Sequence, residues 1–218
     1  MNNGKSKFMK ENVVPMKNNP IKPFRYFALH KPFGYLSQFV TSHKKKKVLS
    51  DIFPFPDEVM PIGRLDEDSE GLLLLTNNGK MHQYLLAHHA EKEYWVLVEG
   101  EVNSAQLKQL NEGIDISHQS IVYTTKPAVV KILDEVNIVE RYPRVRYHPY
   151  KKHTWLSITI KEGRFRQVRK MTAAIGCPTL RLIRVRIGNY TLPEINNIGM
   201  VVELTHEEVS QTGFKPLV

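Results

Sequence analysis

The apolar residues of the chain recur at spacings that predict short strands and helices from about residue 24 onward. Strands are predicted where β-branched, aromatic or leucine residues alternate or form short apolar runs. In the first half these runs are RYFALHKP (25–32), the leucines 72–75 and KEYWVLVEG (92–100). A further run, YLSQFV, resumes after Pro32 and Gly34 and predicts a hairpin-like entry to the fold.

Three segments have the spacing of helices. The first is KMHQYLLAHH (80–89), and the second begins near Ser104 and stops at Gly113. In the third, EGRFRQVRKMTAAIGCP (162–178), one side of the helix is apolar and another is basic. The apolar side comprises Phe165, Val168, Thr172 and Ile175, the basic side comprises Arg166, Arg169 and Lys170, and the segment ends at Gly176 and Pro178.

Between residues 114 and 160, β-branched and aromatic runs predict an antiparallel, sheet-rich middle. These runs are IVYTT, AVVKIL, NIVERY and TWLSITI, and strands in RLIRVRIGNYTL and GMVVELT close the fold. The chain has no internal repeat, no strict βαβ alternation, and neither a Rossmann nor a P-loop fingerprint. The predicted class is α+β, with a mixed, largely antiparallel sheet flanked by helices.

The composition adds a strong positive charge to this picture. Lysine and arginine outnumber aspartate and glutamate by 31 to 22, which gives a net charge of +9 and a pI near 9.5. This charge favours phosphate polymers as partners, although a solvated basic surface would have the same composition. The run HKKKK (43–47) has the same two interpretations, a solvated loop or a phosphate contact.

The single cysteine, Cys177, excludes an internal disulfide and has no Cys or His partners at metal-ligand spacing. This usage fits a reducing compartment. The sequence has neither an apolar run of membrane-spanning length nor the apolar segment of a signal peptide. We therefore expect a cytoplasmic protein with no zinc site and no membrane contact.

The stretch DEDSEG (66–71) spaces Asp66, Asp68 and Glu70 before a glycine, as a calcium-binding loop does. The place that needs a bidentate glutamate holds Asn77, so calcium binding is rejected.

Asp66 lies between Arg64 and the run of leucines, which would hold its carboxylate rigidly at the rim of a cleft. Taken alone, the position favours a turn or a surface ion pair over a catalytic role, because most such aspartates serve those purposes. The neighbouring residues of this acidic stretch are interpreted without a catalytic role. Asp68 or Ser69 is expected to be a turn or cap residue, and the side chains of Glu67 and Glu70 are expected to be solvated.

The basic helix carries too many cations within two turns for one structural ion pair. We interpret them as groups that grip phosphates while one of them pairs with a buried carboxylate. Arg181, Arg184 and Arg186 in the following strand continue this positive surface.

Four motifs, with KPFGYLSQF (31–39) as an opening motif, together resemble the RsuA-type pseudouridine synthases. They are GRLDEDSEGLLLLTNNG (63–79), KEYWV (92–96), EGRFRQVRKM (162–171) and LIRVRIGNYTL (182–192). The resemblance covers about residues 24–205, and within the family it is greatest to the RluE-like branch, which modifies 23S RNA of the large ribosomal subunit. It implies the pseudouridine synthase catalytic fold, with a central active-site cleft.

The resemblance also divides the chain into a flexible basic tail (1–23), a catalytic domain (24–210) and a C-terminal tail (211–218). Many RsuA-type enzymes carry an N-terminal S4 RNA-binding domain, which is not expected here. Target recognition is then expected to depend on the catalytic domain and its basic loops, including the basic and aromatic stretch ERYPRVRYHPYKKH (140–153).

By resemblance, Asp66 in GRLD is the catalytic carboxylate. It acts either as a nucleophile on the nucleotide or as the base that removes a sugar proton through a glycal intermediate. The resemblance makes Arg169 the arginine that keeps this carboxylate ionised, Tyr94 the active-site tyrosine and Leu182 the apolar residue beneath the pocket. The reaction detaches uracil from C1′ and rejoins it through C5, so neither a cofactor nor a metal is expected.

Residues in and beside the motifs are expected to contact RNA: Arg64, Lys92, Arg164, Arg166, Gln167, Lys170 and Arg184. Arg64 is expected to fill or stabilise the space that a uridine leaves when it flips out of its stack. The expected partner is large-subunit ribosomal RNA, bound by a monomer in loops or single strands.

Two other functions share these features. A noncatalytic ribosomal-RNA binding protein has the same basic residues but requires nothing special of Asp66. A glycosidase or base-excising hydrolase would use an aspartate beside a sugar together with a second carboxylate. Its candidates are Glu67, Asp68 and Glu70.

Overall fold

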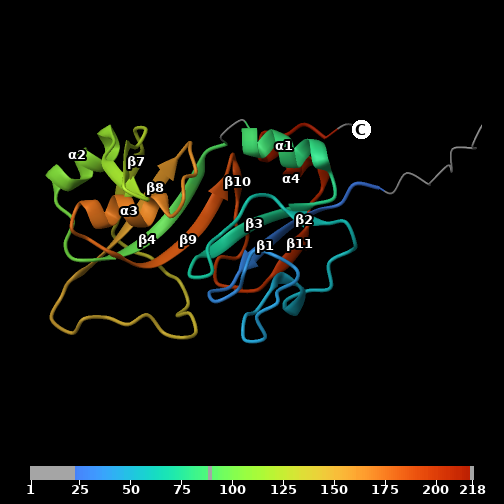
Figure 1. Ribbon diagram of the computed structural model, residues 1–218, viewed down its shortest axis with the longest axis horizontal. Coiled ribbons are helices and arrows are strands. Elements are labelled where there is room, and N and C mark those ends of the chain that lie inside the picture. Colours follow the sequence, from blue (N-terminus) through green and yellow to red (C-terminus); the bar gives the residue numbers. More distant parts are fainter. Residues whose placement is uncertain (1–22, 88–89, 217–218) are drawn as a thin grey trace, which may run out of the picture.

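A computed structural model describes residues 23–87 and 90–216, so the expected tail at 1–23 lies outside the described residues except for Pro23. The fold is α+β, as predicted, with helices packed on a mixed sheet (Figure 1). The strands of the main sheet are β1 (Tyr26–Lys31), β2 (Met60–Pro61), β3 (Glu70–Thr76), β4 (Lys92–Glu99), β7 (Val129–Leu133), β8 (His153–Ile160), β9 (Thr179–Ile187), β10 (Tyr190–Thr191) and β11 (Val201–Glu203). The remaining elements are the hairpin β5 (Asp115–His118) and β6 (Ile121–Thr124), the 3-10 turn η1 (Leu49–Asp51), and the helices α1 (Gly79–Ala87), α2 (Ser104–Glu112), α3 (Gln167–Ala174) and α4 (His206–Gln211).

The main sheet runs in the order β11-β1-β3-β9-β4-β8-β7, with β10 paired to β9 and β2 to β3. Among its described strand pairs, only β3 and β9 are parallel. That contact joins two antiparallel halves: β1, β2, β3 and β11 with α1 and α4 on the right of Figure 1, and β4, β7, β8 and β9 with α2 and α3 on the left.

The parallel contact is short and depends on a glycine. It spans two residue pairs, Glu70 with Ile183 and Gly71 with Arg184. Gly71 has a φ of +101°, and a Cβ built there would lie 2.6 Å from the backbone nitrogen of Arg184. Only glycine tolerates this backbone conformation and this close approach together.

The four leucines of β3 are buried on both faces of the sheet, which explains why they form a continuous apolar run. Leu73 and Leu75 belong to the larger core cluster, which also contains residues of β4, β8 and α3. Leu72 and Leu74 pack in the second cluster with α1 and α4. Because that second cluster includes Phe214, the chain still contributes to the core after residue 210.

The predicted helices are present, but the third begins later than expected. Asn103 caps α2, and the helix ends before Gly113, as the sequence indicated. Helix α3 begins at Gln167, whereas the predicted apolar side began at Phe165. Phe165 precedes the helix and is 58% exposed, because the backbone at Arg166 turns through a left-handed conformation with φ +52°. The prediction for Phe165 was therefore wrong.

Two predicted strands are absent from the described residues. The YLSQFV segment makes only an isolated bridge between Tyr35 and Lys47, and side chains satisfy backbone groups in this region. The ammonium of Lys31, for example, donates to the carbonyl of Tyr35 at 2.7 Å. NIVERY (137–142) lies in the irregular loop 134–152. The side chain of Arg141 in this segment forms an ion pair with the buried Glu70.

No helix in the described part of the chain combines the length and apolar character that a membrane crossing requires.

His30 on β1 is a buried titratable group with an acid-sensitive environment. It is 1% exposed, and neither ring nitrogen has a hydrogen-bond partner among the described residues. Burial, followed by the positive charge of Arg181, lowers the pKa of His30 from 6.5 to about 4. Since the folded protein buries the neutral ring, the stability contribution is complete above pH 6.5 and is lost as the pH falls towards 4.

We expect the free energy of unfolding to fall by up to about 3 kcal/mol from this group as the pH is lowered, because the unfolded chain binds the proton more tightly. In His30→Leu this contribution should disappear. Urea denaturation followed by tryptophan fluorescence, at about pH 7 and about pH 4.5, measures the difference. An identical pH dependence in the two proteins would contradict the assignment.

Candidate active site

A cavity of about 660 Å³ lies between the two halves of the sheet. Its wall is built from β3, β4, β8, β9, α1 and the start of α3, together with residues 36–37 and the loops 62–69 and 163–166. Most of the residues predicted from the sequence line it: Arg64, Asp66, Lys92, Tyr94, Arg164, Arg166, Gln167, Leu182 and Arg184. The structure therefore brings together residues that are up to 120 positions apart in the sequence, which the motifs alone could not show.

The backbone of Asp66 is fixed on both sides. Before it, the hydroxyl of Ser37 donates to the carbonyl of Leu65 at 2.8 Å and accepts from the Leu65 amide at 3.0 Å. After it, the amide of Ser69 donates to the Asp66 carbonyl at 3.0 Å and closes the predicted turn. The Asp66 side chain is 35% exposed, so an anchored backbone presents an accessible carboxylate.

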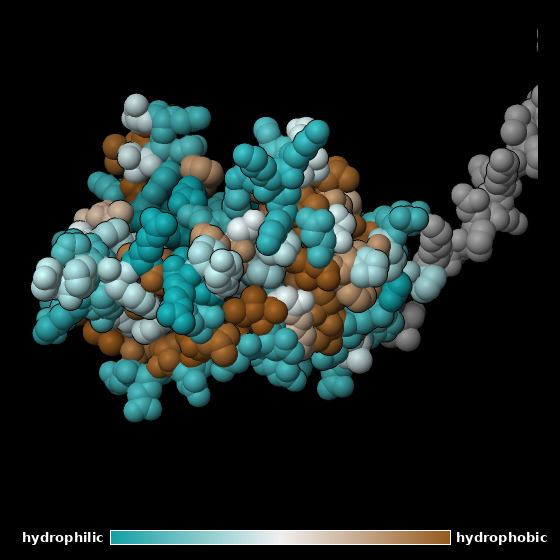
Figure 2. Space-filling model, turned by 90° about the horizontal axis from the view of Figure 1, so that it is seen from below, coloured by the Kyte–Doolittle hydropathy of each residue, from teal (hydrophilic) through white to brown (hydrophobic). Residues whose placement is uncertain are grey.

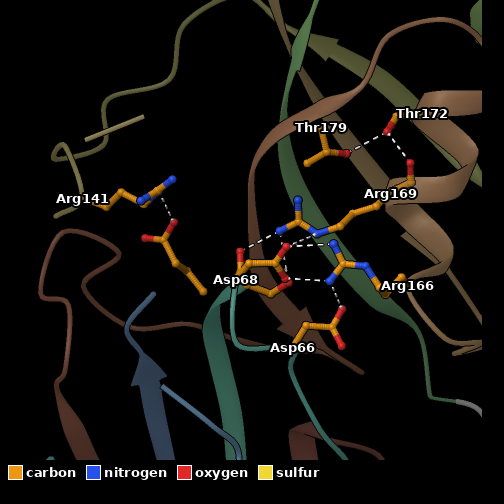
Figure 3. Close-up of polar contacts among 9 residues, drawn as sticks. Asp66, Asp68, Arg141, Arg166, Arg169, Thr172 and Thr179 are labelled. Atoms are coloured by element: carbon orange, nitrogen blue, oxygen red, sulfur yellow. Dashed lines mark hydrogen bonds and ion pairs between the residues drawn. The ribbon is translucent and has the colours of Figure 1, made fainter. Parts of the chain in front are cut away.

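The arginine in direct contact with Asp66 is Arg166, and Arg169, the arginine expected beside Asp66, interacts with that carboxylate through its charge (Figure 3). Nη1 of Arg166 lies 3.4 Å from the Asp66 carboxylate and donates to Asp68 at 2.9 Å, while its Nη2 donates to Asp68 at 2.8 Å. Arg169 instead donates to the backbone carbonyl of Asp68 at 2.6 Å. The left-handed turn at Arg166 brings its side chain to the acidic loop, which a regular helix pattern could not predict.

Asp68 is more than the turn residue that the sequence indicated. Burial alone would raise the pKa of Asp68, but the hydrogen bonds from Arg166 and the charge of Arg169 outweigh it, and the pKa is lowered. Asp68 therefore stays ionised at neutral pH.

Glu70 is fully buried, so the prediction that it is solvated was wrong. It accepts two hydrogen bonds from Arg181, at 2.9 and 2.8 Å, and lies 3.6 Å from Arg141. A carboxylate in this position requires such partners, because an unpaired buried charge is strongly destabilising.

The strand β9 does not carry the continuous positive surface that was predicted. Arg181 is 4% exposed and is paired with Glu70, and Arg186 is held by Glu93 at 2.9 Å. Arg184 is also buried, and its Nε donates to the carbonyl of Leu72 at 2.7 Å. Arg184 nevertheless lines the cavity, and its Nη2 has no hydrogen-bond partner among the described residues.

Tyr94 and Leu182 form apolar parts of the cavity wall on the neighbouring strands β4 and β9. Tyr94 is 8% exposed and Leu182 is 6% exposed. Their burial fixes both side chains, as expected for residues that would shape a binding site.

Gln167 holds the start of α3 through a carboxylate that sequence reasoning missed. Its amide donates to Glu162 at 2.6 Å, and Glu162 also accepts from the hydroxyl of Tyr123 at 2.5 Å. The guanidinium of Arg164 lies 3.3 Å from the ring centroid of Tyr123. The signal that could have revealed Glu162 is its place directly before the basic segment, where a carboxylate is needed to hold these groups.

Lys170 and Arg169 are absent from the residues that line the cavity. The ammonium of Lys170 lies 5.2 Å from the ring centroid of Phe165, which does line the cavity.

The described residues contain no group of three or more His, Cys, Asp or Glu side chains arranged to hold a metal ion.

The loop 134–152 forms a second basic and aromatic feature and is anchored close to the acidic stretch. Arg141 reaches Glu70, and its guanidinium lies 3.8 Å from the ring centroid of Phe33. Beyond this anchor, Tyr142 and Tyr150 are 92% and 91% exposed. The loop projects at the lower left of Figure 1, and Figure 2, seen from below, shows mainly hydrophilic side chains over that side of the molecule.

The chain is similar in both sequence and structure to known proteins. A family model described as RNA pseudouridylate synthase matches residues 25–174. A crystal structure of a pseudouridylate synthase is similar with a TM-score of 0.71 and 30% sequence identity, covering 88% of this chain and 75% of that one.

Two relatives with similar sequences are both named as pseudouridine synthases of a ribosomal subunit. The chain is 42% identical over 188 residues to "Ribosomal large subunit pseudouridine synthase E" of Vibrio vulnificus, covering 85% of this chain and 78% of the relative. It is 31% identical over 217 residues to "Ribosomal small subunit pseudouridine synthase A" of Salmonella typhimurium, covering 97% of this chain and 85% of the relative.

Lys92 should titrate far below an ordinary lysine. Burial, followed by the positive charge of Arg184, lowers the pKa of Lys92 from 10.5 to about 8. After reductive methylation with ¹³C-formaldehyde, we expect an NMR signal with a midpoint near this pH that is missing from Lys92→Arg. A Lys92 signal that moves only above about pH 10, the range of a solvated lysine, would contradict the environment described here.

Proposed function

Since the chain belongs to the RNA pseudouridylate synthase family, we propose that it converts a uridine of large-subunit (23S) ribosomal RNA to pseudouridine, with Asp66 as the catalytic carboxylate. The observation that carries the proposal is the position of Asp66. Its anchored and accessible carboxylate lines a cavity of nucleotide size among several cations.

The choice of large-subunit RNA follows from the relatives. Four of those named "Ribosomal large subunit pseudouridine synthase E" are 42–44% identical to this chain, whereas those named for the small subunit are 30–31% identical.

The proposed reaction breaks the bond between N1 of uracil and C1′ of ribose, rotates the retained base, and forms a bond between C5 and C1′. The proton on C5 is then lost, and N1 gains one, so atoms and electrons balance without a redox partner. Asp66 serves either as the nucleophile that holds the freed fragment or as the base that removes a sugar proton. Both routes use the carboxylate, which lies 3.4 Å from Nη1 of Arg166.

Other cavity residues have supporting roles in this proposal. Tyr94 stacks on the uracil ring, and its hydroxyl assists proton transfer at C5. Leu182 supports the base from the neighbouring strand. Arg169 donates to the backbone carbonyl of Asp68 and contributes positive charge to the site.

Cations around the cavity opening hold the RNA backbone while the uridine is flipped out of its stack. Arg64 is exposed beside Asp66 and fills the vacated space. Arg164, Lys92 and Arg184 lie farther along the cavity wall, and Arg184 retains an unpartnered nitrogen among the described residues. Lys170 contacts the backbone outside the cavity, and Gln167 acts through the position of α3.

Loop 134–152 extends this RNA-binding surface, because exposed tyrosines beside cations are suited to stacking on unpaired bases. The proposed unit is a monomer. Its proposed location is the cytoplasm, where a bacterial ribosomal RNA would be met.

A hydrolase that releases the base is less well supported. It would need a second carboxylate that is protonated at neutral pH. The pKa of Asp68 is lowered, and Glu70 is enclosed by arginines outside the cavity lining. Glu67 lines the cavity, but its carboxylate accepts hydrogen bonds from the ammonium of Lys46 at 2.8 and 2.6 Å, so none of the three is suited to be that acid.

We expect Asp66→Asn to bind ribosomal RNA with an affinity within about threefold of the wild-type protein and to form pseudouridine at least about a thousandfold more slowly. The amide keeps the size of the side chain but cannot act as a nucleophile or base. Carbodiimide treatment followed by primer extension measures the product.

Asp115→Asn is a matched control, since Asp115 lies on β5 outside the cavity lining and bonds to the hydroxyl of Thr124. Full activity of Asp66→Asn would refute the role of Asp66. Release of free uracil by the wild-type protein would identify a hydrolase, and RNA binding without any product would identify a noncatalytic binding protein.

Replacing both Tyr142 and Tyr150 by alanine should weaken binding to a ribosomal RNA fragment by at least about thirtyfold, because two stacking contacts are lost and each costs about 1–3 kcal/mol. Filter binding at fixed salt measures the change. Phe24→Ala, which removes a half-exposed ring outside loop 134–152, should bind normally. Unchanged affinity of the double variant would remove loop 134–152 from the proposed surface.

A further inference from the structure

Asp68 is the residue on which Arg166 and Arg169 converge (Figure 3). Its carboxylate accepts two hydrogen bonds from Arg166, at 2.9 and 2.8 Å, and lies 3.5 Å from Nε of Arg169. Its backbone carbonyl accepts a further bond from Arg169 at 2.6 Å. Asp66 has one longer contact with these groups, 3.4 Å from Arg166. The guanidinium of Arg166 is thus held mainly by Asp68.

The local backbone leaves the Arg166 side chain dependent on this carboxylate. Arg166 precedes the first turn of α3, and its side chain makes no hydrogen bond that caps the helix. The side chain is 34% exposed, so the surrounding atoms enclose it only in part. Asp68 in turn is fixed relative to Asp66 by the turn that Ser69 closes. Asp68 can therefore set where the cation lies relative to Asp66.

The position of this cation matters for the proposed chemistry. A carboxylate that accepts two hydrogen bonds from a guanidinium has its lone pairs occupied and is less available to attack carbon or remove a proton. A carboxylate with no cation nearby loses the stabilisation of its charge. One long contact between Arg166 and Asp66 meets both requirements.

We propose that Asp68 is a positioning residue: it holds Arg166 in a bidentate pair and orients Arg169, so that Asp66 stays beside positive charge without being bound by it. The inference rests on the proposed function for its kinetic consequence. The lowered pKa of Asp68 provides the ionised form that such a pair needs, since the arginine contacts outweigh the effect of burial.

The kinetic test is Asp68→Asn, which keeps the size of the side chain and removes its charge. We expect the single-turnover rate of pseudouridine formation to fall by about ten- to a hundredfold, the cost of misplacing a catalytic environment by a fraction of an ångström to an ångström. The dissociation constant for RNA should stay within about threefold, and the thermal midpoint should stay close to that of Asp115→Asn. Asp68→Glu, which restores the charge, should recover part of the rate.

A second measurement does not depend on activity. In a ¹⁵N–¹H spectrum of the arginine Nε groups, assigned with Arg166→Lys and Arg169→Lys, we expect the Arg166 and Arg169 signals to shift in Asp68→Asn. They should be unchanged in Asp115→Asn. If Asp68 acts through Arg166, the rate losses of Asp68→Asn and Arg166→Lys should also be smaller in combination than their product.

A wild-type rate for Asp68→Asn would overturn the positioning role, as would a rate loss fully accounted for by unfolded protein. Unchanged arginine signals would show that Asp68 does not hold the guanidinium groups. If the wild-type protein forms no pseudouridine, the proposed function fails, and the spectra still decide whether Asp68 positions Arg166.

Discussion

The candidate site depends on ion pairs between the acidic stretch 66–70 and arginines from distant segments of the chain. Asp66, Asp68 and Glu70 occupy alternate positions, and their partners come from the loop before α3, from α3 itself, from β9 and from loop 134–152. Each carboxylate removed from water needs a cation to offset its desolvation. The pairs therefore tie the two halves of the sheet together where the cavity lies.

Along the same five residues the acidic side chains change from buried, at Glu70, to partly exposed, at Asp68 and Asp66. The Glu70 side chain is 1% exposed and enclosed by Arg181 and Arg141, whereas those of Asp68 and Asp66 are 36% and 35% exposed. The buried end is fixed by short charge-assisted hydrogen bonds. Because the backbone is held there and again at Leu65, the accessible end needs few contacts of its own to keep its position.

Sequence patterns predicted the elements whose causes are local. The leucine run of β3 and the limits of α2 follow from burial on two faces and from Asn103 and Gly113. The patterns failed where a partner far away in the sequence determines the environment of a side chain. Glu70 looks solvated until Arg181, 111 positions away, is placed against it. The contact of Arg166 with Asp66 likewise depends on the left-handed backbone at Arg166, which helical spacing does not reveal.

Gly71 gives a further consequence for how such a site can vary. The separation of the two halves at their junction is limited by the contact of its Cα with the backbone of Arg184, where no side chain fits. Gly71 itself is not among the residues that line the cavity. The close approach of the two halves therefore depends on a residue outside the cavity wall, and substitutions of the lining residues leave that approach unchanged.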